Sequence, residues 1–415
     1  MIIKNFKDLA TTKSRKDALE IVNAGIESVL VDKTFKKEIK ISGNKLKIKG
    51  KTWKILKDHI YVVGAGKAAA DMAKVVEEKL GKFIKEGIVI DTRITKLKKI
   101  KVVKGTHPLP SQINISATKR IIKILRNATE EDLIINLISG GGSALLAYPR
   151  VNLKKLIEVN KLLLKRGAKI EEINTVRKHI SKIKGGQLSQ LAGKAKVVSL
   201  IVSDVITNDL NVISSGPTVS DPTTVKYAKK VQKKYHLPKL PFIETPKGKL
   251  TNTTNVLLIT NVLAAKTMGK KAKSLGYKTN ILTTELEGEA RKIGKKLAKE
   301  VSKGKALIAA GETTVTVHGK GKGGRNQEIA LSASKFLESG VLVSCSTDGV
   351  DFITDAAGGI VDSTTSQIAK EKKLDYEKYL KNNDSYNYLK KVKGIIKTDK
   401  TGTNVGDLIV VLGEK

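Results

Sequence analysis

The chain has 415 residues, of which 40% are hydrophobic, 28% are charged and 4% are aromatic. This length and apolar content are enough for two domains with buried cores, and they exclude a disordered chain or a coiled coil. No run approaches the roughly 18 consecutive apolar residues of a membrane span, and the N-terminus lacks the apolar core of a signal peptide. We therefore expect a soluble, cytoplasmic protein with no membrane partner. The single cysteine, Cys345, excludes an internal disulfide framework and any multi-cysteine metal site.

The formal net charge is +38, carried by 78 lysines and arginines against 40 acidic residues. A charge of this size suggests nucleic acid when it is clustered, because phosphate neutralisation dominates such binding. Here the lysines are spread over almost every amphipathic segment, and few aromatic side chains are present to stack on bases. We therefore expect no nucleic-acid partner, and favour a lysine-coated surface whose field attracts anionic small molecules.

Apolar residues at helical spacing predict an amphipathic helix over residues 13–31, and alternation of apolar and polar residues predicts a hairpin over 39–55. Beyond residue 59, short β-branched runs alternate with segments of helical period. In the first half these runs are 60–63, 88–90, 133–138 and 197–202. Such alternation is typical of βαβ units on a parallel sheet, so the predicted fold class is α/β with a Rossmann-like N-terminal domain.

Three of the eight prolines, Pro238, Pro241 and Pro246, fall within nine residues. This cluster predicts a linker over 238–247, between an N-terminal domain of residues 1–237 and a C-terminal α/β domain of residues 248–415. Strands of the second domain are predicted at 256–259, 279–282, 306–310, 341–343 and 408–412. The cleft between the two domains is the expected place of the active site.

In open α/β sheets ligands bind outside the carboxyl ends of the strands, so the residues that follow each strand are candidates for the site. The first loop runs Gly64-Ala65-Gly66-Lys67-Ala68-Ala69 into an alanine-rich helix start. It lacks the third glycine of a dinucleotide fingerprint, and its glycine-to-lysine spacing is too short for a Walker loop. Glycines and a helix N-terminus still suit an anion, for which Lys67 is well placed. The alternative is a plain strand-to-helix turn.

A second loop, Ser139-Gly140-Gly141-Gly142-Ser143, separates another buried strand from an apolar helix. Three glycines between two serines form a nest of backbone donors suited to phosphate, and the alternative is a flexible turn. The third loop places Asp204 directly after a strand, where it suits a metal ion or the proton of a hydroxyl group, with a helix cap as the competing role. His107 is a candidate for lining the cleft.

The C-terminal half adds Glu312, the glycines Gly323 and Gly324, and Arg325 directly before a predicted helix. In a chain so poor in arginine, Arg325 suggests stabilisation of a transferring phosphoryl group, and a surface salt bridge is the alternative. Asp348 lies among carboxylates and glycines after another strand, which suits Mg²⁺, although the Asp348-Gly349 pair is also typical of a simple turn.

Together these loops resemble the glycerate 2-kinase family, whose C-terminal part is the MOFRL domain. The resemblance begins near residue 60 and keeps the order of the family's motifs. They are Val63 to Ala69, Gly105-Thr106-His107-Pro108-Leu109-Pro110, Ser139 to Leu145, Ile173 to His179 with Lys184-Gly185-Gly186, Ser203-Asp204-Val205, Ser215-Gly216-Pro217-Thr218, Gly311 to Val315, Gly323 to Glu328 and Thr347-Asp348-Gly349. Each short motif is unspecific, whereas their ordered combination is specific.

The resemblance implies ATP-dependent phosphorylation of D-glycerate at its 2-hydroxyl, giving 2-phosphoglycerate and ADP with Mg²⁺ or another divalent cation. It also implies a homodimer of two-domain chains and a place in non-phosphorylating sugar degradation of the Entner-Doudoroff type. Lys67 and Arg325 match the lysine and arginine that the family is thought to use at the reacting groups. A hydroxypyruvate reductase is the alternative enzyme, and the incomplete glycine fingerprint argues against it.

The resulting hypothesis assigns roles to the motif residues. The substrate is held by Lys67, Arg325, Asn326 and His107, and we expect replacement of Arg325 by alanine to leave folding stability almost unchanged. Asp204 orients or deprotonates the hydroxyl group or binds the metal ion, with Asp348 as a second metal ligand. The predicted ATP-binding residues are Gly64, Gly66, Ser139, Gly140, Gly141, Gly142, Ser143, Glu312, Gly323 and Gly324.

Overall fold

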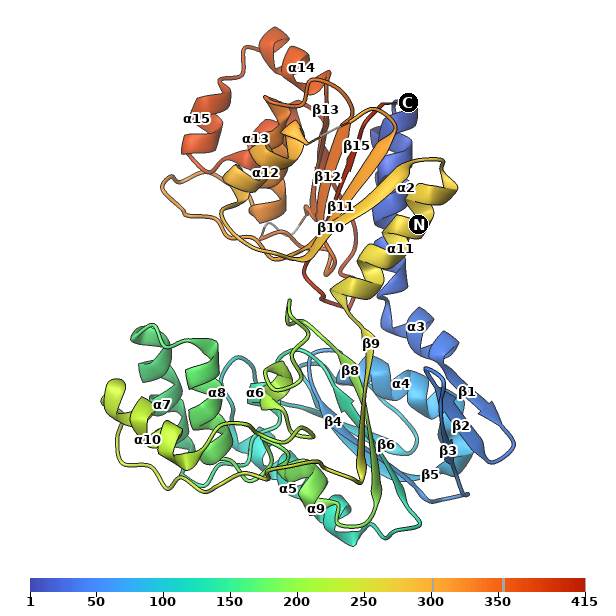
Figure 1. Cartoon of the computed structure of the whole chain (residues 1–415), viewed down its shortest axis with the longest axis vertical. Helices are drawn as coiled ribbons and strands as arrows, with labels where there is room; N and C mark the ends of the chain where they lie inside the picture. Colours follow the sequence, from blue (N-terminus) through green and yellow to red (C-terminus); the bar gives the residue numbers. More distant parts are fainter. Residues whose placement is uncertain (301, 353–354, 415) are drawn as a thin grey trace. The chain divides into compact units, whose positions relative to one another are not determined.

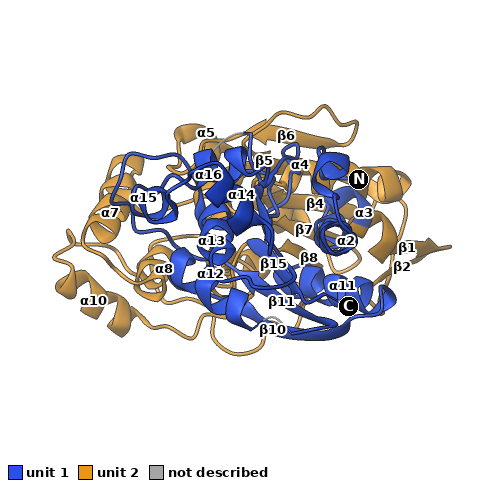
Figure 2. Ribbon diagram, turned by 90° about the horizontal axis from the view of Figure 1, so that it is seen from above, with its two compact units in different colours: residues 1–33, 259–415 blue, residues 34–258 orange. Residues whose placement is uncertain are grey.

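The computed structural model describes residues 1–300, 302–352 and 355–414. The chain forms two compact units: unit 1 comprises residues 1–33 and 259–415, and unit 2 comprises residues 34–258 (Figure 2). The predicted boundaries at 237 and 248 do not coincide with this division. The proline-rich segment lies inside unit 2, where Leu237 and Leu240 are buried in a cluster of helices, so it packs on the domain instead of linking two domains.

Unit 2 is built on a six-stranded sheet of order β6-β5-β4-β7-β8-β9. The strands are β4 (Ile60–Ala65), β5 (Ile84–Asp91), β6 (Ile100–Lys104), β7 (Leu133–Ile138), β8 (Lys196–Val202) and β9 (Thr253–Ile259). The pairs from β6 to β8 are all parallel, which confirms the Rossmann-like prediction. Every residue of β4 and β7 is buried, as expected for strands covered on both faces. Strand β9, predicted for the second domain, is the edge strand beside β8.

Helices cover both faces of this sheet (Figure 1). Helix α4 (Ala69–Leu80) packs on one face, and α5 (Gln112–Asn127) with α9 (Gln187–Leu191) covers the other. A short 3-10 turn, η1 (Gly81–Phe83), leads from α4 into β5. The predicted hairpin is a three-stranded antiparallel sheet of β1 (Ile39–Ser42), β2 (Lys45–Ile48) and β3 (Lys51–Lys54), because a second turn with positive φ at Lys49 and Gly50 adds one more strand.

The remaining helices of unit 2 follow the two glycine-rich loops. They are α6 (Gly142–Leu145), α7 (Leu153–Lys165), α8 (Ile170–His179), the 3-10 turn η2 (Ile213–Ser215) and α10 (Val225–Lys234). Helices α7, α8 and α10 share an apolar cluster of their own, separate from that of the sheet. Helix α7 begins at a cap in which the side chain of Asn152 accepts from the Lys155 amide, and α8 begins with Glu172 bonded back to the Lys169 amide.

Unit 1 contains a second six-stranded sheet of order β10-β11-β15-β12-β13-β14. The strands are β10 (Lys278–Leu286), β11 (Lys305–Gly311), β12 (Val341–Ser346), β13 (Gly358–Asp362), β14 (Ile395–Ile396) and β15 (Asp407–Leu412). Within the described part of this sheet, β10 and β11 pair in parallel and the other pairs are antiparallel. This sheet is therefore mixed, and sequence analysis missed β13 and β14.

N-terminal residues complete this unit. Helix α2 (Lys13–Ser28) and α11 (Asn261–Ser274) pack together on one face of the sheet, and α12 (Ala290–Lys299) with α13 (Arg325–Ser334) covers the other (Figure 1). The predicted helix over 13–31 ends earlier, at Ser28, and α3 (Val31–Glu38) follows it. The short helices are α1 (Phe6–Leu9), α14 (Thr365–Glu371), α15 (Tyr376–Lys381) and α16 (Ser385–Lys391).

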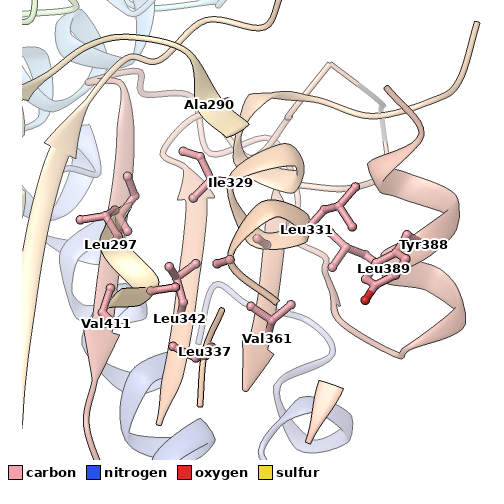
Figure 3. Packing of buried hydrophobic residues seen from close by; sticks show 14 of the residues in the cluster. Ala290, Leu297, Ile329, Leu331, Leu337, Leu342, Val361, Tyr388, Leu389 and Val411 are labelled. Atoms are coloured by element: carbon pink, nitrogen blue, oxygen red, sulfur yellow. The ribbon is translucent and has the colours of Figure 1, made fainter. Parts of the chain in front are cut away.

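The core of unit 1 surrounds α13, as Figure 3 shows. Ile329 and Leu331 from this helix are fully buried. They belong to the same apolar cluster as Leu342 of strand β12 and Leu389 of helix α16. Since α13 is buried on all sides, its first turn holds Arg325 and Asn326 at a fixed place beside the strand ends. Across the described residues, no helix is long and apolar enough to cross a membrane.

Candidate functional site

The first two predicted loops lie side by side at the carboxyl ends of β4 and β7. The Lys67 amide donates to the carbonyl of Gly140 at 2.8 Å, and the Ala68 amide donates to Ser139 Oγ at 3.1 Å. This contact explains Gly66, which has φ +150°: a Cβ there would lie 2.0 Å from Ser139 Oγ. Gly64 is required for a similar reason, because its Cβ would lie 2.1 Å from the carbonyl oxygen of Leu137 on the neighbouring strand.

The third loop closes on the second. A Cβ at Gly140 would lie 2.2 Å from Asp204 Oδ2, so the Asp204 carboxylate lies directly against the glycine-rich loop. A Cβ at Gly142 would lie 2.1 Å from Ser214 Oγ, whose hydroxyl donates to the Ser139 carbonyl. These glycines are therefore needed for close packing of loops, a reason that sequence analysis did not consider.

Two cationic or titratable side chains flank Gly141, which has φ +80°. A Cβ added there would lie 3.0 Å from His107 Cδ2 and 3.2 Å from Lys67 Cε. The Lys67 side chain is exposed. Burial first, and then the charge of Lys67, lowers the pKa of His107, so its ring is neutral at neutral pH. The structure thus brings together Lys67, His107 and Asp204 around Gly140 and Gly141.

The loop also presents backbone donors. Among the described residues, the amides of Gly140, Gly141 and Ser143 have no acceptor in the chain, whereas the amide of Gly142 donates to Ser139. The Ser143 hydroxyl is bonded to Ser215 Oγ at 2.9 Å. Three unsatisfied amides next to an exposed lysine form a concave arrangement of donors of the kind that holds an anion.

Sequence analysis missed Arg93, which belongs to the same set of strand ends. Its guanidinium donates to the Lys67 carbonyl at 3.2 Å and to Asp71 at 2.6 Å. Buried Asp91, the last residue of β5, accepts from the Ala70 amide at the start of α4. The signal was available, because Asp91 and Arg93 directly follow a predicted strand.

The candidates of unit 1 form a separate cluster at the start of α13. Arg325 binds Asp407 through two bonds, Nε to Oδ2 at 2.6 Å and Nη2 to Oδ1 at 3.0 Å, and its Nη1 lies 2.6 Å from Glu312. Burial alone would lower the pKa of Arg325, but the two carboxylates raise it overall. Burial raises the pKa of Asp407 to about 6, although Arg325 opposes the shift. The arginine is therefore held between a buried acid and an exposed one.

Asn326 lies beneath this pair and is completely buried. Its amide donates to Asp407 at 2.8 Å and to Asp351 at 3.3 Å, and its carbonyl accepts from Ser344. In this structure Asn326 therefore orders the acids behind Arg325, and its predicted contact with substrate stays a prediction. Burial also raises the pKa of Asp351, against the effect of its amide donors.

The neighbouring glycines are again required by packing. A Cβ at Gly323 would lie 2.0 Å from Ser385 Oγ, and one at Gly324 would lie 2.3 Å from the Asp351 carbonyl. Sequence analysis missed Asp407, because its partner Arg325 lies 82 residues earlier. The role of Gly323 and Gly324 in binding the nucleotide stays a prediction.

The predicted metal ligands differ in their surroundings. Asp348 Oδ1 accepts from the Ser346 hydroxyl and from the Val350 amide, which is the bonding of a turn residue. In the described ranges, no group of three or more His, Cys, Asp or Glu side chains is arranged to hold a metal ion. Mg²⁺ needs only one or two carboxylates when phosphate supplies further oxygens, and the Asp204 carboxylate lies against the predicted phosphate-binding loop.

A cavity of about 250 Å³ opens beside the glycine-rich loop within unit 2. Its lining includes His107, Gly141 and Ser143 of the loops at the strand ends, together with Arg177 and Lys184. The walls between them are largely apolar, with side chains from α7, α8 and the segment after His107. The motif containing Arg177 was recognised from the sequence, but no role was assigned to it.

Comparison with known proteins identifies the two halves. Residues 17–242 match the model of a domain of unknown function, DUF4147, and residues 305–407 match the MOFRL family. The fold is thus an α/β protein that combines these two domains.

Full-length relatives define the family. A glycerate 2-kinase of Pyrococcus horikoshii is 41% identical, covering 96% of this chain and 97% of its own. The crystal structure of a glycerate kinase from Thermotoga maritima superposes with a TM-score of 0.88 at 39% identity, covering 96% of this chain and 99% of that one. A relative in Agrobacterium vitis, 35% identical over 85% of this chain and 86% of its own, carries the provisional name of hydroxypyruvate reductase. The chain belongs to the glycerate kinase family.

Proposed function

We propose that this protein phosphorylates D-glycerate at its 2-hydroxyl, using ATP and a divalent cation and releasing 2-phosphoglycerate and ADP. The observation that carries the proposal is the arrangement of Lys67, His107 and Asp204 around the open amides of Gly140 and Gly141. Family membership supports the same reaction, since the Pyrococcus relative bears the name of a glycerate 2-kinase.

Phosphoryl transfer requires positioning and charge stabilisation more than covalent chemistry from the protein. In the proposed site, the amides of Gly140, Gly141 and Ser143 donate to phosphate oxygens, and the Lys67 ammonium group neutralises charge that develops during transfer. His107, neutral because of burial and the nearby lysine, contributes a hydrogen bond without adding charge. Gly64 and Gly66 support this loop through packing.

Asp204 is the proposed acceptor of the proton from the 2-hydroxyl, or the ligand of the cation. Its carboxylate fits the cation because it is exposed and lies against the phosphate-binding loop. A bound divalent ion would neutralise triphosphate charge and orient the transferred group.

Arg325 is proposed to stabilise charge on the reacting groups. Its Nη1 is paired with Glu312, whose side chain is 42% exposed, whereas Nε and Nη2 are held by buried Asp407. An anionic ligand would compete with Glu312 for Nη1. Asp407 would still bind Nε and Nη2, and so it fixes the orientation of the guanidinium.

The test is incubation of the purified protein with D-glycerate, ATP and Mg²⁺, followed by a coupled enolase assay. An enolase signal without phosphoglycerate mutase supports 2-phosphorylation. A signal that requires the mutase shows 3-phosphorylation, which contradicts the proposed position. Oxidation of NADH with hydroxypyruvate, in the absence of ADP release, would establish the reductase instead.

The remaining predictions from the family, a homodimer and a cytoplasmic location, belong to this proposal too. Light scattering on the purified protein gives the mass of the assembly directly, and a mass of one chain would contradict the dimer.

A further inference from the structure

The cavity beside the glycine-rich loop is lined by two basic side chains that have no acidic partner among the described residues. Lys184 is 5% exposed, and its ammonium group donates to the Leu146 carbonyl at 2.8 Å. Arg177 donates through Nε to Asn160 Oδ1 at 2.7 Å. Neither side chain forms an ion pair with any residue that the structure describes. Burial lowers the pKa of both, and the charge of Arg177 contributes to the shift at Lys184.

The same segment shows how a cation is normally buried. Lys178, one residue after Arg177, is 3% exposed and lies 3.2 Å from the carboxylate of Asp221. Asp221 in turn accepts from Thr223 and Thr245. A buried charge without such a partner costs several kcal/mol, as an order of magnitude. The fold therefore supplies an acid for Lys178 but leaves Arg177 and Lys184 to face an open cavity.

Asn160 fixes the direction of the arginine. Its amide nitrogen donates to the Leu156 carbonyl at 2.9 Å, so its oxygen is held for Arg177 Nε. With Nε occupied, the two terminal nitrogens of the guanidinium are the donors left for a ligand. A planar fork of this kind matches a carboxylate or a phosphate through two parallel bonds.

We propose that Arg177 and Lys184 form the subsite that binds the carboxylate of the acceptor acid. This inference rests on the proposed function and names the group that orients its substrate. The cavity, at about 250 Å³, is smaller than the pockets that hold drug-sized ligands and suits a short organic acid. His107 and Gly141 line the same cavity, and a Cβ at Gly141 would lie 3.2 Å from Lys67 Cε, so the cavity that holds Arg177 also borders the proposed phosphoryl-transfer site.

This placement differs from the hypothesis drawn from sequence, in which Lys67 and Arg325 are among the residues that hold the substrate. It leaves Lys67 for the phosphoryl group, and it assigns to Arg177 and Lys184 the one group of glycerate that is always charged at neutral pH. A phosphate group offers the same chemistry as a carboxylate, so the test must separate the acceptor from the nucleotide.

The first measurement is calorimetric binding of D-glycerate to the nucleotide-free protein. We expect Arg177→Gln and Lys184→Gln to weaken binding on the order of 10- to 100-fold, the range for loss of a hydrogen bond to a charged group. The matched control is Lys182→Gln, which removes an exposed lysine that lies over the ring of Tyr148 and does not line the cavity. Unchanged glycerate affinity in both cavity variants would overturn the proposal.

A second measurement exploits the ligand. Glyceramide lacks the carboxylate, so we expect it to bind wild-type protein weakly and to lose nothing further in Arg177→Gln. Equal wild-type affinities for glycerate and glyceramide would overturn the proposal even if both protein variants failed to fold.

Steady-state kinetics then distinguish the source of the anion. A rise in KM for glycerate with unchanged KM for ATP supports the carboxylate, and the reverse pattern assigns the subsite to nucleotide phosphate and overturns it. The enolase assay on wild-type protein tests the proposed function by itself, whereas the calorimetric measurements do not require turnover, so the two failures are distinguishable.

Discussion

Replacement of Arg325 by alanine should destabilise unit 1 as well as reduce turnover. Asp407 is 1% exposed and receives two of its hydrogen bonds from Arg325, so the variant would leave a buried carboxylate with Asn326 as its side-chain donor among the described residues. Removing one partner of a buried ion pair costs about 3–5 kcal/mol. For a unit of this size each kcal/mol lowers Tm by about 2–4 °C, which gives a fall of about 6–20 °C.

The pH dependence of this loss has a definite sign. The folded-state pKa of Asp407, about 6, lies above its ordinary value of 3.8, so the stability associated with the bound proton is lost as pH rises through that interval. Without Arg325 this pKa rises further, and the loss continues to higher pH. The difference in unfolding free energy between wild type and variant should therefore be largest above pH 7 and should shrink below pH 6.

Thermal and urea unfolding between pH 5 and 8 would measure this effect. Glu312→Gln is the control, because the Glu312 side chain is 42% exposed and loss of its ion pair with Arg325 should cost less than about 1 kcal/mol. Adding Asp407→Asn to the alanine variant should restore part of the lost stability. A Tm within about 2 °C of wild type at pH 7.5 would refute the reasoning. The sequence predicted that Arg325→Ala would leave folding stability almost unchanged. The buried ion pair with Asp407 instead predicts a loss of stability.

Three further outcomes are expected. Gly66→Ala should cost about 1–3 kcal/mol or more, since the new Cβ would meet Ser139 Oγ at 2.0 Å, and chemical unfolding measures the loss. Lys67→Met should raise the pKa of His107, because the lysine charge contributes to its lowering, and it should reduce turnover; an unchanged NMR titration would contradict the contact. Lys184→Met should stabilise the ligand-free protein below pH 7 by at most about 5 kcal/mol, because burial lowers the pKa of Lys184 from 10.5 to about 7. The free-energy cost of burying the charged lysine is fully present below pH 7 and disappears as the pH rises from 7 to 10.5. Equal slopes of stability against pH from 7 to 10 in both proteins would show that the lysine is not strained.

Much of unit 2 could be predicted because its signals are local. The runs at 60–63, 133–138 and 197–202 are β-branched and bounded by turns, and β4, β7 and β8 lie there. Since parallel strands end at the same edge of a sheet, their following loops had to meet, and the contact of Lys67 with Gly140 follows from that rule.

Other features depend on pairing between distant segments. The apolar alternation of β9 is the same whether it joins one sheet or the other, so its place beside β8 could not be read from its own residues. The acids that hold Arg325 lie after the end of β11 and at the start of β15, and Asp407 on β15 is 82 residues from Arg325 in the sequence. From sequence, a glycine-rich loop indicates a phosphate-binding site. In the structure, close contact with Ser139 or Asp204 is a second reason why a side chain would not fit at several of these glycines.

The discontinuous make-up of unit 1 has a consequence for biosynthesis. Helix α2 emerges from the ribosome early, but β12, β15 and α11, against which it packs, are made only after all of unit 2. At about 5–20 residues per second, α11 follows α2 after roughly 10–50 s and β15 after roughly 20–80 s, and until then the apolar face formed by Ile21, Val22 and Ile26 lacks these partners. Unit 2 can fold in that interval, whereas unit 1 cannot be completed until its own C-terminal strands have been made. Shortening the N-terminus by 30 residues should therefore damage the C-terminal half first.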